Sequence, residues 1–143
     1  TLVDEKLGEL IGKGGWAALV VSLRNVDAFR DAYGFVASDD VLRAVSLMMV
    51  NAIQESSNTP GFIGHLAPND FVLILRQEHL AAVSERIRSR LEQSLDYFYP
   101  LKDRDQAASR ADRLFVHVAH LAANEARVDS LDQLKELLKR KAQ

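Results

Sequence analysis

The sequence of 143 residues contains no cysteine, only three prolines and no long apolar run. The lack of cysteine excludes disulfides, thiolate zinc sites and a cysteine nucleophile, and it fits a reducing compartment. No stretch approaches the roughly 20 apolar residues that cross a bilayer. The N-terminus also lacks the basic segment and apolar stretch of a secretory signal. We therefore expect a cytoplasmic protein that does not insert into a membrane.

An excess of positive charge is missing as well. Eighteen basic and twenty acidic side chains leave a formal net charge of −2. Binding to a phosphate backbone needs a basic surface, so nucleic-acid binding is not expected. With 48% apolar and 27% charged residues, the composition is that of one globular domain spanning residues 1–143.

The spacing of apolar residues predicts an alternation of helices and strands. Short helices are expected over 2–11 and 26–33, and a longer helix capped by Ser38 is expected to end at the polar cluster 56–61. The last two predicted helices span 78–98 and about 131–141, the latter opened by a capping box at Ser130 and Gln133. Residues 102–113 are polar and without pattern, which predicts a loop. Strands are predicted over 16–23, 62–66, 71–75 and 114–122.

This order predicts an α+β fold, an α/β sandwich with a ferredoxin-like β-α-β-β-α-β core and an extra N-terminal helix within residues 1–14. That helix could connect to an upstream domain. In such a topology the first strand lies beside the following hairpin, so the loop after Leu23 approaches the turn Ala67–Asp70. We expect the functional site at this edge. A ferredoxin-like RNA-binding module is an alternative, but it would need exposed aromatic residues on central strands and a basic face.

Three stretches at this edge resemble motifs of the GGDEF family, the diguanylate cyclase domains that condense two GTP molecules into cyclic di-GMP with divalent metal. The fold predicted from the apolar pattern agrees with that family. The family's Asp-x-Asp-x-Phe-Lys, Tyr-Gly-His-x-x-Gly-Asp-x-x-Leu and Gly-Gly-Asp-Glu-Phe motifs correspond here to Asn25-Val26-Asp27-Ala28-Phe29-Arg30, Tyr33-Gly34-Phe35-Val36-Ala37-Ser38-Asp39-Asp40-Val41-Leu42 and Ala67-Pro68-Asn69-Asp70-Phe71.

The departures from the family pattern fall on the positions that carry its chemistry. The resemblance implies a magnesium ligand at position 25, where an asparagine stands, and hard cations need carboxylate charge. Val26 could still offer its backbone carbonyl. Of the two acidic hairpin positions, Asn69 has lost its carboxylate and Asp70 keeps one. No catalytic residue and no bound metal are therefore expected.

The nucleotide-binding positions are also altered. Ala67 adds a Cβ and Pro68 removes an N–H where paired glycines let the backbone approach the nucleotide. Asp39 matches one guanine-reading position of the family. The family's inhibitory Arg-x-x-Asp falls on 58–61, which is Asn58-Thr59-Pro60-Gly61, so no inhibitory site is expected. Ordinary helix-start chemistry at Asp39 and turn chemistry at Asp70 are favoured over a residual nucleotide or metal site.

These observations support three hypotheses. The first is a catalytically inactive GGDEF-like regulatory or dimerisation module of a bacterial signalling protein, whose partners are other domains of the same protein and a second copy of itself. The second is a receptor domain that binds GTP or cyclic di-GMP in the remaining cleft. The third, ranked lowest, is an active cyclase with substituted ligands, because weakened charge neutralisation costs most in phosphoryl transfer. Magnesium and GTP are implied only if the cleft functions.

Overall fold

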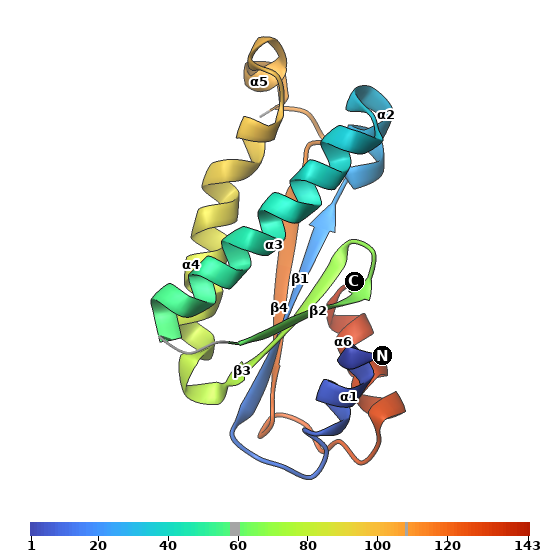
Figure 1. Cartoon of the computed structure of the whole chain (residues 1–143), viewed down its shortest axis with the longest axis vertical. Helices are drawn as coiled ribbons and strands as arrows, with labels where there is room; N and C mark the ends of the chain where they lie inside the picture. The colour runs from blue at the N-terminus through green and yellow to red at the C-terminus, as the bar shows by residue number, and fades with distance from the viewer. Residues whose placement is uncertain (58–60, 108) are drawn as a thin grey trace.

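The computed structural model describes residues 1–57, 61–107 and 109–143. Four strands form one antiparallel sheet in the order β2-β3-β1-β4. Helices α3 and α4 cross one face of the sheet, while α1 and α6 pack together on the other (Figure 1). The elements are α1 Leu2–Gly8, β1 Trp16–Arg24, α2 Val26–Tyr33, α3 Phe35–Ser57, β2 Phe62–Ala67, β3 Asp70–Arg76, η1 Gln77–His79, α4 Leu80–Ser94, η2 Leu95–Phe98, α5 Leu101–Ala107, β4 Phe115–Ala122 and α6 Leu131–Lys141.

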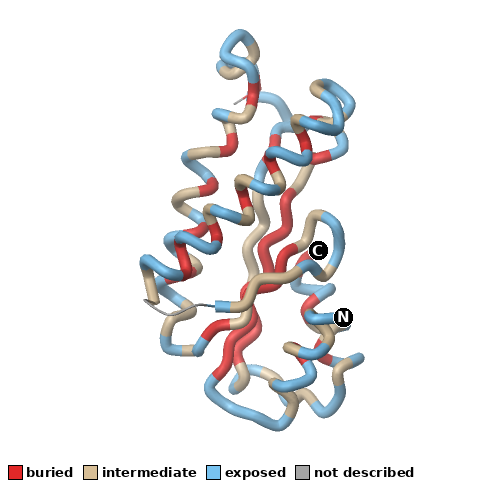
Figure 2. The backbone as a smooth tube through the Cα atoms, in the orientation of Figure 1, coloured by how far each residue is buried: buried red, intermediate tan, exposed pale blue. Residues whose placement is uncertain are grey.

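Strand β1 is central because its side chains are apolar on both faces. Residues 17–21 are fully buried, and successive side chains of a strand point to opposite sides of the sheet. Leu19 and Val21 therefore join the core under α3 and α4. Ala18 and Val20 join a second core under α1 and α6. Figure 2 shows the buried stretches concentrated in the sheet and on the inner sides of the helices.

The predicted α+β fold is confirmed, including the central strand and the hairpin of β2 and β3. The N-cap of α6 is confirmed too, because the Ser130 hydroxyl accepts a 3.1 Å hydrogen bond from the Gln133 amide. The other half of the capping box differs, since the Gln133 side chain accepts from the Asp129 amide at 2.9 Å and not from that of Ser130. Leu134 and Leu138 then anchor the helix on the sheet. Within the described residues, no helix is both long enough and apolar enough to span a membrane.

Four predicted boundaries are wrong. Helix α3 begins at Phe35 rather than after Ser38, because Gly34 with φ 93° separates it directly from α2; Ser38 is buried inside the helix. Helix α1 ends at Gly8, and the segment predicted as one helix over 78–98 consists of η1, α4 and η2. The predicted loop 102–113 contains helix α5. The expectation for 58–60 lies outside the described residues.

Candidate functional site

The expected site lies where β1 ends beside the turn between β2 and β3. Ala67 is the last residue of β2 and Asp70 the first of β3, with Pro68 and Asn69 forming the turn. The Leu23 amide donates a 2.8 Å hydrogen bond to the Asn69 carbonyl. The topology therefore brings the end of β1 and the hairpin turn together as the sequence predicts.

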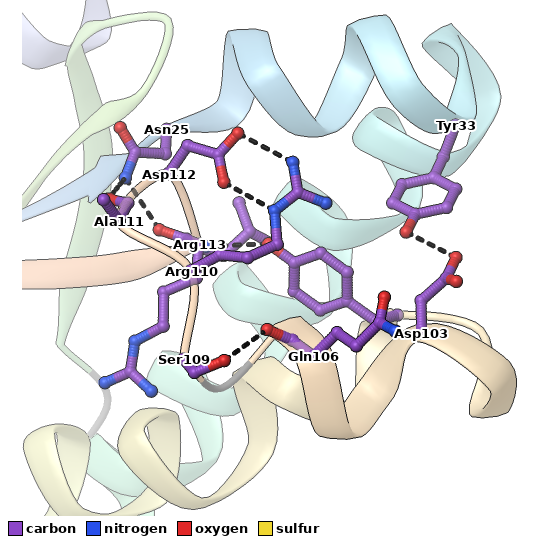
Figure 3. A network of polar contacts seen from close by, with 11 residues as sticks. Asn25, Tyr33, Asp103, Gln106, Ser109, Arg110, Ala111, Asp112 and Arg113 are labelled. Carbon is purple, nitrogen blue, oxygen red and sulfur yellow. Dashed lines mark hydrogen bonds and ion pairs between the residues drawn. The ribbon is translucent and has the colours of Figure 1, made fainter.

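Asn25 joins β1 to α2 in a left-handed conformation with φ 67°, which asparagine adopts more readily than most residues. Its side-chain amide nitrogen donates to the Arg113 carbonyl at 2.7 Å and lies 3.5 Å from the Ala111 carbonyl. Both carbonyls belong to the segment that leads into β4 (Figure 3). The amide nitrogen of Asn25 therefore ties the start of α2 to that segment.

Asp70 makes a different set of contacts. Its carboxylate accepts a hydrogen bond from the Ser22 hydroxyl, and Ser22 is its register partner on β1. The Ser22 oxygen accepts a 3.1 Å bond from Arg24 Nε, and the same guanidinium donates to the Ala142 carbonyl at the end of α6. The one carboxylate of the hairpin is thus part of a chain of contacts that fastens the end of α6 to the sheet.

These two positions do not fit the divalent ion that the resemblance implies. In the sheet order, β3 and β4 flank β1 on opposite sides. Asp70 lies on β3, whereas the Asn25 amide nitrogen is bonded to the segment entering β4. Among residues 1–57, 61–107 and 109–143, no three histidine, aspartate or glutamate side chains gather in a way that could hold a metal ion. No reaction step through a metal follows from this arrangement.

The remaining predicted site residues offer little to a nucleotide. Val26 is buried at the start of α2. Ala67 and Pro68 are exposed at the hairpin, and Pro68 has no N–H to donate. Asp39 is exposed on α3 rather than at its first turn. Asp27 binds Arg30 one helical turn away at 2.6 Å, which is the structural role that its place at a helix start favours.

A polar and aromatic cluster that no sequence motif indicates orders α5 beside this site. The rings of Phe29, Tyr33 and Tyr99 pack together with centroids 4.9 to 5.8 Å apart. The Tyr33 hydroxyl donates to Asp103 on α5 at 2.8 Å (Figure 3), and the Tyr99 oxygen accepts from the Leu114 amide at 2.9 Å. The sequence contains these aromatic residues, but their packing against one another depends on contacts between distant segments.

We expect Tyr33→Phe to lower the free energy of unfolding by about 1 kcal/mol, because it removes the bond to Asp103. Burial first, and then the bond to Asp103, raise the pKa of Tyr33 above its ordinary value of 10.0. The stability from the neutral hydroxyl is therefore complete below pH 10.0 and is lost as the pH rises through the raised pKa. Urea unfolding at neutral and alkaline pH measures both effects.

The control for this prediction is Tyr97→Phe. Tyr97 is 68% exposed, and its ring lies against the Arg104 guanidinium at 4.9 Å, a contact that phenylalanine keeps. We expect Tyr97→Phe to leave both the stability and its alkaline dependence unchanged. Equal losses in the two variants would contradict a specific role for the Tyr33 hydroxyl.

No family model matches the chain, and no curated protein matches it. Solved structures do. The active GGEEF domain of a diguanylate cyclase from Vibrio cholerae is similar at 15% identity and TM-score 0.56, over 87% of this chain and 74% of that one. A diguanylate cyclase/phosphodiesterase from Caldicellulosiruptor saccharolyticus is similar at 13% identity and TM-score 0.64, over 97% and 76%. Diguanylate cyclase SiaD from Pseudomonas aeruginosa, solved with its activator SiaC, is similar at 15% identity and TM-score 0.55, over 98% of this chain and 53% of that one.

These similarities define the class of fold. The chain has the α+β fold of GGDEF diguanylate cyclase domains over nearly its whole length. The resemblance inferred from the three motifs is confirmed at this level. Identities of 13 to 15% carry the fold and not the chemistry, so the activity has to be argued from the residues at the hairpin end of the sheet.

Proposed function

We propose that this chain is a catalytically inactive GGDEF-like domain that serves as a regulatory or dimerisation module of a bacterial signal-transduction protein. One observation carries the proposal. The two positions that would bind the metal make structural contacts instead, Asn25 with the segment entering β4 and Asp70 with Ser22 on β1. Phosphoryl transfer depends on a metal and positioned charges to neutralise the triphosphate.

The regulatory part of the proposal has its own support. A fold of this class without metal ligands can still offer surfaces to other domains, to a second copy or to a regulator. SiaD, which has a similar domain, was solved in complex with an activator protein. Large apolar side chains stay exposed at the start of α3, where Phe35 is 73% and Val36 77% accessible. Exposed apolar groups of this size favour contact with a protein partner.

The test is a cyclase assay with GTP and either magnesium or manganese. We expect the purified chain to form no more cyclic di-GMP than a heat-inactivated sample, measured by chromatography at several enzyme concentrations. The active Vibrio cholerae domain serves as the positive control. Product that increases in proportion to the concentration of this chain would overturn the proposal.

A GTP and cyclic di-GMP titration by calorimetry separates this proposal from the receptor hypothesis. We expect neither nucleotide to give saturable heat. At the hairpin, Pro68 lacks an N–H donor and Ala67 carries a Cβ where the backbone would approach a nucleotide. Saturable binding that Asp39→Ala or Asp70→Ala weakens would favour the receptor hypothesis instead.

A further inference from the structure

A cavity of about 490 Å³ lies at the other end of the sheet from the hairpin. It is lined by the loop between α1 and β1 and by the ends of β3 and α3. Its volume falls within the range of about 300–1,000 Å³ that is usual for small-molecule sites. Its lining includes Leu10, Lys13, Trp16, Ile53, Arg76 and His79.

One wall of this cavity is apolar. Leu10 and Trp16 line it and pack in the core under α1 and α6, whereas Ile53 belongs to the core on the other face of the sheet. The loop that closes one side is held by two hydrogen bonds. Trp16 Nε1 donates to the Lys13 carbonyl at 2.9 Å, and the Gln77 amide donates to the Gly15 carbonyl at 2.8 Å. The cavity is therefore held in place by the same strands that form the core, and it can bury an apolar body.

The rim of the cavity is basic. Lys13, Arg76 and His79 line it, and its lining contains no aspartate or glutamate among the described residues. The nearest counter-charge is Glu78, which lies 2.9 Å from Arg76 Nε and 3.6 Å from His79 Nε2. Glu78 therefore partly neutralises the charge of Arg76, whereas Lys13 contributes a positive charge of its own. This balance suits a ligand with a single negative charge better than a triphosphate.

We propose that this cavity binds a small amphipathic organic anion, with an apolar body against Leu10 and Trp16 and a carboxylate or similar group at Lys13 and Arg76. The site lies away from the hairpin, so the proposal goes beyond the function proposed above and holds or fails independently of it. Such a ligand would contact the loop after α1 together with the ends of β3 and α3. Binding would therefore tie together segments far apart in the sequence.

The chain supplies its own probe, because Trp16 is the only tryptophan and lines the cavity. Octanoate, a carboxylate with an apolar tail, should change the tryptophan fluorescence in a saturable way with a Kd of about 1 mM or lower, as expected for a ligand of this size. 1-Octanol has the same tail without the charge, and we expect it to bind at least about tenfold more weakly. No saturable change with octanoate would overturn the proposal, as would equal affinity for octanol.

The double variant Lys13→Glu/Arg76→Glu reverses the charge of the rim. We expect it to weaken octanoate binding by at least about tenfold, because the carboxylate would then face like charges. The matched control is Lys102→Glu/Arg88→Glu, which makes the same change in net charge on α5 and α4 and also alters one ion-paired arginine. It should bind octanoate as the original chain does. Equal weakening in both double variants would contradict a local site.

A milder substitution keeps the test decisive if the double variant unfolds. Lys13→Gln removes one charge from an exposed loop residue and should not affect folding. We expect it to weaken octanoate binding several-fold and to leave octanol binding unchanged. Raising the salt concentration should weaken octanoate binding in the original chain in the same direction. Unchanged octanoate affinity in both measurements would overturn the role of the rim.

Discussion

We expect Asn25→Asp to lower the free energy of unfolding by about 1–2 kcal/mol and not to give the chain cyclase activity. This substitution restores the carboxylate that the resemblance implies at the metal position. In this structure, however, the Asn25 amide nitrogen donates to the Arg113 carbonyl at 2.7 Å. An ionised carboxylate can only accept hydrogen bonds, so it would face the carbonyl oxygens of Arg113 and Ala111 without a donor between them.

Three measurements check this prediction. Urea unfolding at neutral pH gives the loss of stability, and repeating it near pH 4 should shrink the loss, since a protonated carboxyl group can again donate. Added magnesium should not raise the melting temperature of the variant, because the new carboxylate stays on the β4 side of β1. A magnesium-dependent rise in melting temperature would contradict the proposed loss of the metal site.

The control for Asn25→Asp is Asn25→Gly. Glycine accepts the positive φ of 67° at this position and removes the donor without adding a charge. We expect a smaller loss of stability than for aspartate, with no dependence on acid. If glycine and aspartate destabilise the chain equally at every pH, repulsion from the two carbonyls is not the cause.

The sequence predicted the fold well because the relevant signals are local. The run 16–23 is apolar at every position that β1 buries except Ser22, and the turn at Pro68 lies between two apolar runs. The resemblance then placed Asn25 and Asp70 at one edge of the sheet, where the structure also has them. What the sequence could not predict is the direction in which each side chain makes its contacts. The Asn25 partner lies 88 residues away and the Asp70 partner 48 residues away.

Helix α5 was not predicted for a similar reason. Residues 102–113 have no apolar periodicity, so they predicted a loop. Helix α5 is ordered by contacts that no local pattern reveals, namely the bond from Tyr33 to Asp103 and the bonds from Arg104 to the carbonyls of Tyr97 and Tyr99 at 3.4 and 3.2 Å. The cavity beside Trp16 was missed for the same reason, because its lining comes from four separate segments.

Phe71→Ala should have the largest effect of all, lowering the free energy of unfolding by about 3–5 kcal/mol. Phe71 is fully buried and is the largest of the fully buried side chains. It pairs with Val21 on β1 and His65 on β2, and the His65 ring lies 4.5 Å from its own. Truncation therefore leaves a cavity between the hairpin and the helices α3 and α4 that the surrounding strands cannot fill.

The matched control is Phe115→Ala, the same substitution at the start of β4, where the side chain is 43% exposed. We expect it to cost less than about 1 kcal/mol. Urea unfolding measures the loss of stability in both variants. The comparison holds if both unfold in two-state transitions and the slope of the unfolding free energy with urea concentration is unchanged. A loss below about 2 kcal/mol for Phe71→Ala would mean that the hairpin is not held by this ring. The predicted large loss would show that the last residue of the Ala67–Phe71 stretch serves packing, while Asp70 beside it serves the contact with Ser22.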